Sequence, residues 1–231
     1  MGISVILPAF NEEQNLRVLL PKLKKIIEEL TSDYEFIVVD ALKSTDNAES
    51  VCVQHNARYL RQKTEGYGDA FRDGIGACNF ENVLVVDTDN SQDISKIPEM
   101  YNEMQKGAHI VIGSRYTEGG NTKDPILSVI MSKCLNLCFR IVLGFKQKDI
   151  STDFRFYNRD MLKSINPVCK NFDIIEETLF LLIKKYPNID IREIPIDYQK
   201  RLEGISKRNL PLFIMDYIKL LFKLIKIKKG E

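Results

Sequence analysis

Two acidic side chains, Asp87 and Asp89, directly follow a short run of apolar residues, 83–86. Three of these four apolar residues are β-branched valines, which favours a strand buried on both faces, as in a parallel sheet. Two carboxylates at this spacing suit Mg²⁺ or Mn²⁺ that already carries phosphate oxygens, because both ions prefer hard oxygen ligands. The alternative is a strand that ends in an Asx turn, since Asp is a common turn residue.

Further polar groups fall where other predicted strands end, namely segment 8–12, Asp40, and Ser114 with Arg115. The carboxyl ends of parallel strands meet in one crevice, where open α/β folds bind ligands. A metal there would neutralise charge on a leaving diphosphate, and the planar guanidinium of Arg115 would hold a phosphate. The sequence therefore predicts a site for a metal-bridged diphosphate.

The elements that must position these groups alternate along the chain. Apolar runs predict strands at residues 3–7, 34–40, 57–60, 83–86, 109–113, 154–157 and, at a sheet edge, 191–198. Periodicity and capping residues predict helices at 11–30, 44–53, from Gly66 onward, 97–104, 126–143, 159–165 and 176–186. This order predicts an α/β fold with a mostly parallel, doubly wound sheet flanked by helices.

Composition limits the class of protein. The chain has 231 residues, 44% of them hydrophobic, and a net charge of +1, so we expect one large α/β domain and no nucleic-acid partner. Its five cysteines form no CxxC pair, which favours reduced thiols in a cytoplasmic protein. Cys134 and Cys138 are interpreted as core residues of an apolar helix. No stretch of 18 uncharged apolar residues occurs, so no transmembrane span is expected.

The C-terminal segment has a composition of its own, and we divide the chain into a domain at 1–208 and a basic amphipathic helix at 209–231. Residues 212–229 combine a wide apolar face with Lys219, Lys223 and Lys226, which recur at helical spacing. This pattern predicts a peripheral helix on the inner, anionic face of a membrane. The alternative is a helix that packs on its own domain or on a dimer partner, and the oligomeric state stays open.

Six short motifs stand in an order that resembles the family 2 glycosyltransferases, and most closely the polyprenyl- or dolichyl-phosphate mannosyl- and glucosyltransferases. They are Leu-Pro-Ala-Phe-Asn-Glu-Glu (7–13), Val-Val-Asp (38–40), Asp-Thr-Asp (87–89), Gly-Ser-Arg-Tyr with Gly-Gly (113–120), Phe-Arg-Phe-Tyr-Asn-Arg (154–159) and Arg-x-x-Gly-x-Ser-Lys (201–207). The resemblance implies the nucleotide-diphospho-sugar (GT-A) fold, a nucleotide-sugar donor, Mg²⁺ or Mn²⁺, and inversion at the anomeric carbon.

The resemblance also implies roles for single residues. On the nucleotide-sugar side it implies Pro8, Ala9, Asn11, Glu12 and Asp40, with Arg201 and Lys207 on a basic loop over the donor phosphates. For the metal it implies Asp87 and Asp89, with Ser91 or Gln92 as a further ligand. Facing the diphosphate and the acceptor phosphate it implies Arg115, Ser132 and Arg155.

Two departures from the family pattern bear on substrate. The loop after Asp40 lacks the usual second acid and glycine and carries Lys43, which would contact an extra phosphate or a different base. Ser128 stands where lipid-phosphate transferases tend to have an arginine.

We expect a metal-dependent inverting glycosyltransferase whose acceptor is a polyprenyl phosphate at the membrane. That acceptor is already anionic, so catalysis would depend on positioning and on stabilising the leaving diphosphate. If the acceptor is instead a hydroxyl of a glycan or cell-envelope polymer, a base is needed, and Asp153 or Glu177 is the candidate. The third hypothesis is a catalytically degenerate module that binds nucleotide or a partner.

Overall fold

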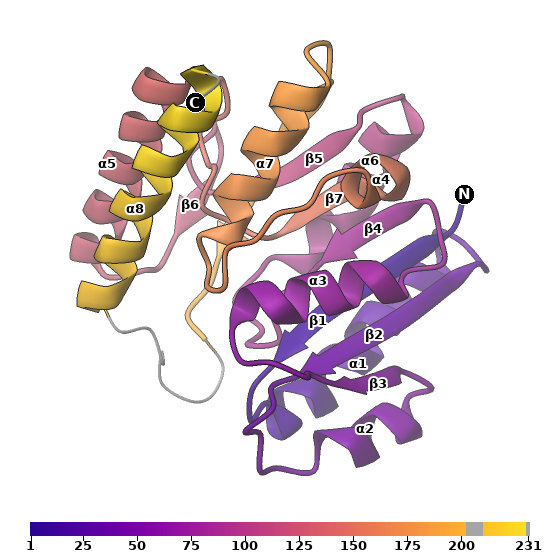
Figure 1. Cartoon of the computed structure of the whole chain (residues 1–231). Coiled ribbons are helices and arrows are strands. Elements are labelled where there is room, and N and C mark those ends of the chain that lie inside the picture. The colour runs from indigo at the N-terminus through magenta and orange to yellow at the C-terminus, as the bar shows by residue number, and fades with distance from the viewer. Residues whose placement is uncertain (202–209, 230–231) are drawn as a thin grey trace.

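The computed structural model describes residues 1–201 and 210–229, and for 210–214 the backbone alone. Its centre is a seven-stranded sheet in the order β3-β2-β1-β4-β7-β5-β8 (Figure 1). The strands are β1 (Ile3–Ala9), β2 (Tyr34–Asp40), β3 (Arg58–Arg61), β4 (Asn82–Val85), β5 (Ile110–Ser114), β7 (Arg155–Asn158) and β8 (Ile191–Pro195). All neighbours are parallel except β7, which runs antiparallel to both β4 and β5. The prediction of a mostly parallel α/β sheet is confirmed.

Helices cover both faces of the sheet, as the doubly wound prediction requires. One face packs against α1 (Glu13–Glu28), α2 (Ala48–Gln54) and α4 (Ile97–Gln105), which follows the short 3-10 helix η1 (Ile94–Lys96). The other face packs against α3 (Tyr67–Ala77), α6 (Arg159–Lys163) and α7 (Ile174–Lys185). Figure 1 shows α3 in front of the sheet and α1 behind it.

Strand β4 is buried on both faces, as its run of valines predicts. Val83 and Val85 belong to the core on the α3 side, while Leu84 and Val86 belong to the core on the α1 side. All four side chains are fully buried. Because full burial of a Val or Leu side chain is worth about 1.5–3 kcal/mol, this strand anchors firmly the turn that carries Asp87 and Asp89.

A second, two-stranded parallel sheet joins β6 (Asn121–Thr122) to β9 (Asp197–Tyr198). The sequence predicts a loop near 119–121 and a single strand over 191–198. The structure instead has β6 in the first segment and two strands, β8 and β9, in the second. Each strand has only two residues, too few to show alternation of apolar and polar residues. The edge position predicted for this part of the chain is correct, because β8 is the last strand of the main sheet.

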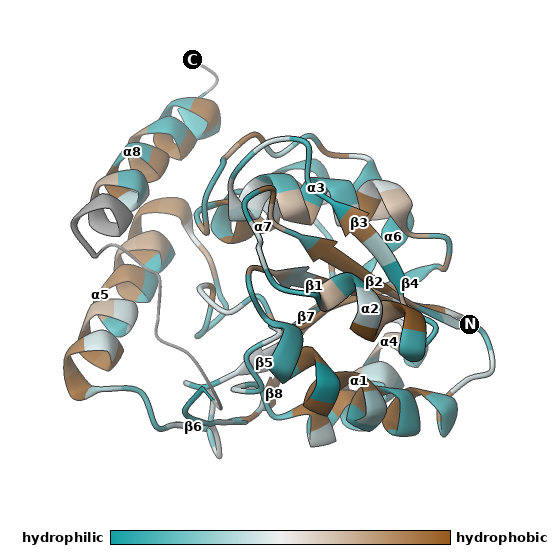
Figure 2. Cartoon of the chain, turned by 90° about the horizontal axis from the view of Figure 1, so that it is seen from below, coloured by the Kyte–Doolittle hydropathy of each residue, from teal (hydrophilic) through white to brown (hydrophobic). Residues whose placement is uncertain are grey.

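Helices α5 (Ile126–Leu143) and α8 (Leu210–Lys229) pack side by side at one end of the molecule (Figures 1 and 2). Within α5 only Asn136, Phe139 and Leu143 are buried. Figure 2 shows hydrophobic positions along both helices. The exposed large apolar side chains of the pair are Ile126, Leu127, Ile130, Leu137, Ile141, Val142, Met215, Ile218 and Phe222.

One prediction about these helices is wrong, and another stays open. Cys134 and Cys138 are exposed and not in the core, because the buried stripe of α5 follows Phe139 and leaves both cysteines on the outer face. In the described part of the chain, α5 is long and apolar enough to count as a candidate membrane span by length and composition alone. Length and composition alone do not show that α5 crosses a membrane, so the expectation of no transmembrane span stays a prediction.

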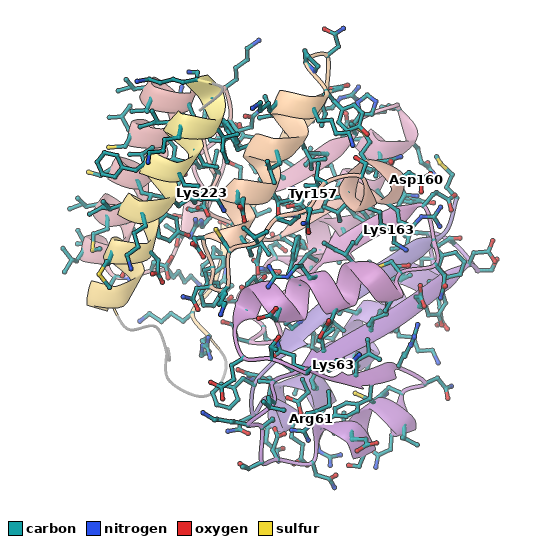
Figure 3. All side chains as sticks on the ribbon, viewed as in Figure 1. Arg61, Lys63, Tyr157, Asp160, Lys163 and Lys223 are labelled. Carbon is teal, nitrogen blue, oxygen red and sulfur yellow. The ribbon has the colours of Figure 1, made fainter. Side chains whose placement is uncertain are left out.

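The position of helix α8 matches one alternative that the sequence left open, a helix packed on its own domain. Tyr217, Leu220 and Leu224 pack into the core on the α7 side, so the helix is docked on its own domain. The predicted lysine stripe is divided: Lys219 and Lys226 are exposed, whereas Lys223 forms an ion pair with the buried Glu177 of α7. In Figure 3, Lys223 lies on the side of α8 that faces α7.

Candidate active site

A cavity of about 890 Å³ opens at the carboxyl edge of the sheet. Its polar wall comes from the ends of β1, β4 and β5, from the loops after β2 and β3, and from the loop before β7. Its other wall comes from α5, with Tyr217 of α8 and Ile175 of α7. The predicted site residues that line it are Pro8, Ala9, Glu12, Lys43, Asp87, Asp89, Ser91, Arg115, Ser132, Asp153 and Arg201.

The two acids after β4 lie on the cavity wall, and Asp89 is held on both sides. Its Oδ1 atom accepts hydrogen bonds from the backbone and the hydroxyl of Ser91, the backbone bond being 2.9 Å long. Its Oδ2 atom lies 3.0 Å from Nη2 of Arg201. The Nη1 atom of the same arginine lies 3.4 Å from Oε1 of Glu12. One guanidinium therefore joins the loop after β4 to the loop after β1.

The side-chain amide of Gln92 is hydrogen-bonded within the protein, and Gln92 does not line the cavity. Its Oε1 accepts the backbone N–H of Asp87 at 3.0 Å, and its Nε2 donates to Oδ1 of Asp153 at 2.7 Å. The other carboxylate oxygen of Asp153 accepts a hydrogen bond from Tyr67. Burial, followed by the nearby charges of Asp153 and Asp87, raises the pKa of Tyr67 well above its usual value. The prediction of Gln92 as a metal ligand does not fit this arrangement, because both ends of its amide are engaged.

The donor set suits a divalent cation that brings ligands of its own. Asp87, Asp89 and Ser91 present oxygen atoms at one end of the cavity, which matches the preference of Mg²⁺ and Mn²⁺. The described residues contain no group of three or more His, Cys, Asp or Glu side chains arranged to hold a metal. Two carboxylates and a hydroxyl fit a cation that also carries phosphate oxygens, and not a site built wholly from protein ligands.

Arg115 is locked in place by Asp149. The guanidinium makes two parallel hydrogen bonds to that carboxylate, of 2.8 and 2.9 Å, and its Nη2 also donates to Ser151 Oγ at 2.9 Å. The rings of Tyr116 and Tyr198 lie 5.0 and 5.4 Å from the guanidinium. Burial opposes ionisation of Asp149, but the charge and hydrogen bonds of Arg115 outweigh it and lower the pKa of the carboxyl. Arg115 thus reaches the cavity as a fixed cation.

Two predicted catalytic residues lie away from the cavity. Arg155 is fully buried and donates to the carbonyl oxygen of Ile150 at 2.6 Å, because β7 directs it beneath α7. Glu177 is buried too, and accepts the backbone N–H groups of Val168 and Cys169 at 2.8 and 2.7 Å. Neither residue lines the cavity, so the geometry gives neither of them contact with a bound substrate there.

Asn11 and Asp40 lie behind the nucleotide side of the cavity and do not line it. Asn11 Oδ1 accepts the backbone N–H of Thr45 at 2.7 Å, which ties the loop after β1 to the loop after β2. Asp40 is fully buried and accepts a 2.8 Å hydrogen bond from Tyr59. Burial is the main cause that raises the pKa of Asp40. Lys43 is exposed at the cavity rim and pairs with Glu65 at 2.5 Å.

Sequence reasoning missed several residues of the site. Asp149 and Tyr67 fix Arg115 and Asp153, while Tyr198 and Tyr217 contribute to the wall. A signal for one of them exists: Asp149, Ser151 and Asp153 alternate just before β7, with polar groups two residues apart. The partners of Tyr67 and Tyr217 are set by tertiary contact and leave no local pattern. The predicted donor-phosphate residue Lys207 lies outside the described residues.

Comparison with known proteins places this geometry in a family. The model of the family described as glycosyl transferase family 2 matches residues 4–165. A dolichol-phosphate mannosyltransferase of Pyrococcus furiosus is 28% identical over 237 residues, which cover 98% of this chain and 64% of the relative. An uncharacterized glycosyltransferase of Mycobacterium bovis is 33% identical over 119 residues, 52% of this chain and 51% of that protein. The chain thus spans between half and two thirds of the length of these relatives.

Solved structures share the fold. Glucosyl-3-phosphoglycerate synthase from Mycobacterium tuberculosis, in complex with Mn²⁺, uridine diphosphate and phosphoglyceric acid, superimposes with a TM-score of 0.76 at 19% identity. The alignment covers 97% of this chain and 78% of that one. The same enzyme with Mg²⁺ and uridine diphosphate gives a TM-score of 0.75 at 18% identity, over 97% of this chain and 79% of the other. The expected GT-A fold is confirmed.

Proposed function

The chain belongs to glycosyl transferase family 2, and from that premise we propose that it transfers a sugar from a nucleoside-diphosphate sugar to a polyprenyl phosphate. We further propose that transfer depends on Mg²⁺ or Mn²⁺ and inverts the anomeric carbon. One observation carries the proposal: a single cavity joins the acids Asp87 and Asp89 at the sheet edge to an apolar wall on α5. The division into a transferase domain at 1–208 and a C-terminal helix at 209–231 is part of this proposal.

On the donor side, the polar wall would hold the nucleoside diphosphate. Pro8, Ala9 and Glu12 line this part of the cavity, with Lys43 at its rim. Asp87 and Asp89 would bind the diphosphate through the cation, which when bound neutralises charge on the leaving group. Arg201 lies 3.0 Å from Asp89 and would contact the same phosphates.

On the acceptor side, the cavity changes from polar to apolar. Ser132 Oγ lies 2.9 Å from Ser151 Oγ, which in turn accepts from Arg115. Beyond Ser132, the wall consists of Met131, Leu135 and Tyr217. A phosphate near Arg115 would have its isoprenoid chain along this wall. Because a phosphate acceptor is already anionic, the residues need only hold it in line with the anomeric carbon.

The outer face of α5 and α8 supports a membrane location for this reaction. Ile130, Ile141 and Phe222 are 53%, 74% and 64% exposed, and so broad an apolar surface is unusual in water. Lys219, Lys226, Lys228 and Lys229 are exposed on α8, which suits anionic lipid. We propose that the protein is cytoplasmic and binds the inner face of the membrane through residues 212–229 together with α5.

A second candidate function is transfer to a hydroxyl of a glycan or cell-envelope polymer. The position of Asp153 favours it, because this acid lines the cavity between Tyr67 and Gln92. A hydroxyl must lose its proton during transfer, and Asp153 would be the acceptor of that proton. Phosphoglyceric acid in the Mycobacterium tuberculosis enzyme also makes a small phosphorylated acceptor a candidate for the same assay.

The test incubates the protein and Mn²⁺ with UDP-, GDP- and CDP-sugars, each with and without a short polyprenyl phosphate. We expect one donor to give a glycosylated lipid phosphate, and expect Asp89→Ala to lower its rate at least a hundredfold, the scale for loss of a charge-stabilising group. Asp160→Ala, an exposed acid on α6 labelled in Figure 3, is the matched control with unchanged rate.

Transfer only to a hydroxyl acceptor would support the second function. A protein that neither hydrolyses nor transfers any donor would instead be a binding module. Circular dichroism of both variants distinguishes loss of function from loss of fold.

A further inference from the structure

Arg201 pairs with the carboxylate oxygen of Asp89 that Ser91 does not contact, an oxygen suited to bind a cation. Its Nη2 lies 3.0 Å from Oδ2 of Asp89, whose Oδ1 already accepts two hydrogen bonds from Ser91. A cation at Oδ2 would lie close to the guanidinium, so repulsion between the two positive charges opposes its binding until Arg201 moves away. The same guanidinium is 3.4 Å from Oε1 of Glu12, so it neutralises acids from two loops at once.

Arg201 is held less tightly than Arg115. Arg115 is 10% exposed and is bound bidentately by Asp149 with bonds of 2.8 and 2.9 Å. Arg201 is 29% exposed, and its two ion-pair contacts go to different acids. Neither acid holds Arg201 bidentately, so release of Arg201 costs less than release of Arg115.

A diphosphate gives Arg201 a better partner than Asp89. Phosphate oxygens accept two parallel hydrogen bonds from a guanidinium, whereas Arg201 makes one contact to Asp89 and one to Glu12. A metal–diphosphate therefore brings both the cation that needs Asp89 and the anion that accepts Arg201. A cation without a diphosphate competes with Arg201 for Asp89 and gives the arginine no other partner.

We propose that Arg201 is a cation surrogate which makes metal binding depend on the nucleoside diphosphate. It lowers the affinity of Asp87 and Asp89 for a cation alone and raises their affinity for a cation that arrives with a diphosphate. The inference rests on the proposed function, since it assumes a nucleoside-diphosphate donor. By reciprocity, the metal raises nucleotide affinity by the same factor. Arg201 acts here as a positioning and selectivity residue and not as a catalytic one.

The experiment measures Mn²⁺ binding by electron paramagnetic resonance, with and without UDP or GDP, on the full chain. In the wild type we expect weak binding of Mn²⁺ alone and binding at least tenfold tighter with the correct nucleotide. Arg201→Gln should bind Mn²⁺ alone about tenfold more tightly, a change of about 1.4 kcal/mol, and should lose most of the effect of nucleotide. Arg201→Lys keeps the charge, so Mn²⁺ alone should still bind weakly.

Arg192→Gln is the matched control, because Arg192 is 31% exposed and also pairs with two acids, Glu103 and Asp190, on the surface. It should behave like the wild type. Equal affinity of the wild type and Arg201→Gln for Mn²⁺ alone would overturn the inference even if nucleotide binds. If the wild type binds no nucleoside diphosphate with Mn²⁺, the proposed function itself fails, which is a different result. Thermal unfolding of each variant confirms that the fold is kept.

Discussion

The two walls of the cavity are stabilised by different kinds of interaction. The wall at the sheet edge consists of charged and polar side chains that fix one another: Asp149 holds Arg115, and Tyr67 with Gln92 holds Asp153. The wall of α5 and α8 is mainly apolar beyond Ser128 and Ser132, and most of α5 is exposed. Hydrogen bonds set the geometry of the first wall, whereas apolar packing sets most of the geometry of the second.

The difference teaches how the two substrates would be treated. Charge that develops on a leaving diphosphate is stabilised best by dipoles and cations that do not need to reorganise, and the sheet edge supplies those. An isoprenoid chain has no charge to recognise, so a plain apolar surface suffices and tolerates chains of different length. Variants that unlock the first wall should therefore cost stability, while variants of the second should change association with lipid.

The largest effect is expected from Asp149→Asn, which breaks the lock on Arg115. Asp149 is fully buried and the side chain of Arg115 is 10% exposed, so loss of the carboxylate leaves a buried cation with weaker partners. Removal of one member of such a pair costs about 3–5 kcal/mol. Urea unfolding at pH 7 measures this loss. Asp190→Asn, which removes a partly exposed partner of Arg192, is the control and should cost under about 1 kcal/mol.

The pH dependence of that loss has a definite sign. Interaction with Arg115 keeps the pKa of Asp149 below its ordinary value in the folded protein, so the unfolded chain binds the proton first. The stabilisation is complete above the ordinary aspartate pKa of about 3.9 and disappears as the pH falls through the lower, folded value. The difference between wild type and Asp149→Asn should narrow in acid. A loss that stays constant from pH 7 to pH 3 would contradict an electrostatic lock.

The difference between the walls also separates what the sequence predicts from what it does not. The run of valines before Asp87 predicts a strand buried on both faces, because period and β-branching are local properties. The same holds for the bounds of α5, where a long apolar run predicts both ends correctly. Positions at strand ends, such as Asp89 and Arg115, follow from the parallel topology, since that topology directs all such ends to one edge.

The sequence contains no such local signal for how a side chain is oriented toward a neighbour that is distant in sequence. Arg155 follows the motif of the family, yet α7 covers the side of β7 that carries it, and its guanidinium donates to Ile150 O. Cys134 and Cys138 lie on an apolar helix, yet the buried stripe of that helix runs elsewhere. In both cases the prediction of the element is correct and the prediction of its environment is wrong, because packing partners decide the environment.

A smaller effect is expected on the outer face of the helical wall. The double variant Ile130→Glu with Phe222→Glu places two carboxylates on the exposed surface of α5 and α8, where these side chains are 53% and 64% exposed. Burial of each apolar side chain in lipid would be worth about 1.5–3 kcal/mol, so co-sedimentation with anionic liposomes should fall at least tenfold. Soluble donor hydrolysis should stay unchanged, because neither residue lines the cavity.

Val53→Glu is the control for that variant. Val53 is 71% exposed on α2, on a helix that packs on the opposite side of the sheet from α5. It adds the same charge to an exposed apolar position without touching the helical wall. Equal loss of liposome binding in both proteins would indicate a general charge effect, and no loss in either would show that the α5–α8 surface does not bind lipid.

The smallest effect is expected behind the helical wall, from Glu176→Gln. Glu176 is fully buried on α7, and burial, partly opposed by the charge of Arg155, raises its pKa to about 8. The folded protein therefore retains a proton that an unfolded glutamate loses near pH 4.5, and stability falls as the pH rises between these values. A glutamine has no proton to lose, so the variant should unfold a few degrees above wild type at pH 8 and equal it near pH 4.

The adjacent acid, Glu177, tests the direction of this pH effect, because its surroundings shift its pKa in the opposite direction from that of Glu176. Burial alone would raise its pKa, but hydrogen bonds from Lys223 and from the backbone of Cys169 lower it. Glu177→Gln should therefore destabilise the protein at neutral pH, and the loss should shrink as the pH falls below about 4.5. Melting temperatures of both variants from pH 4 to pH 9 should thus change in opposite directions relative to wild type. Parallel curves would mean that Lys223 does not hold α8 on α7 through this carboxylate, and that the helical wall depends on apolar packing alone.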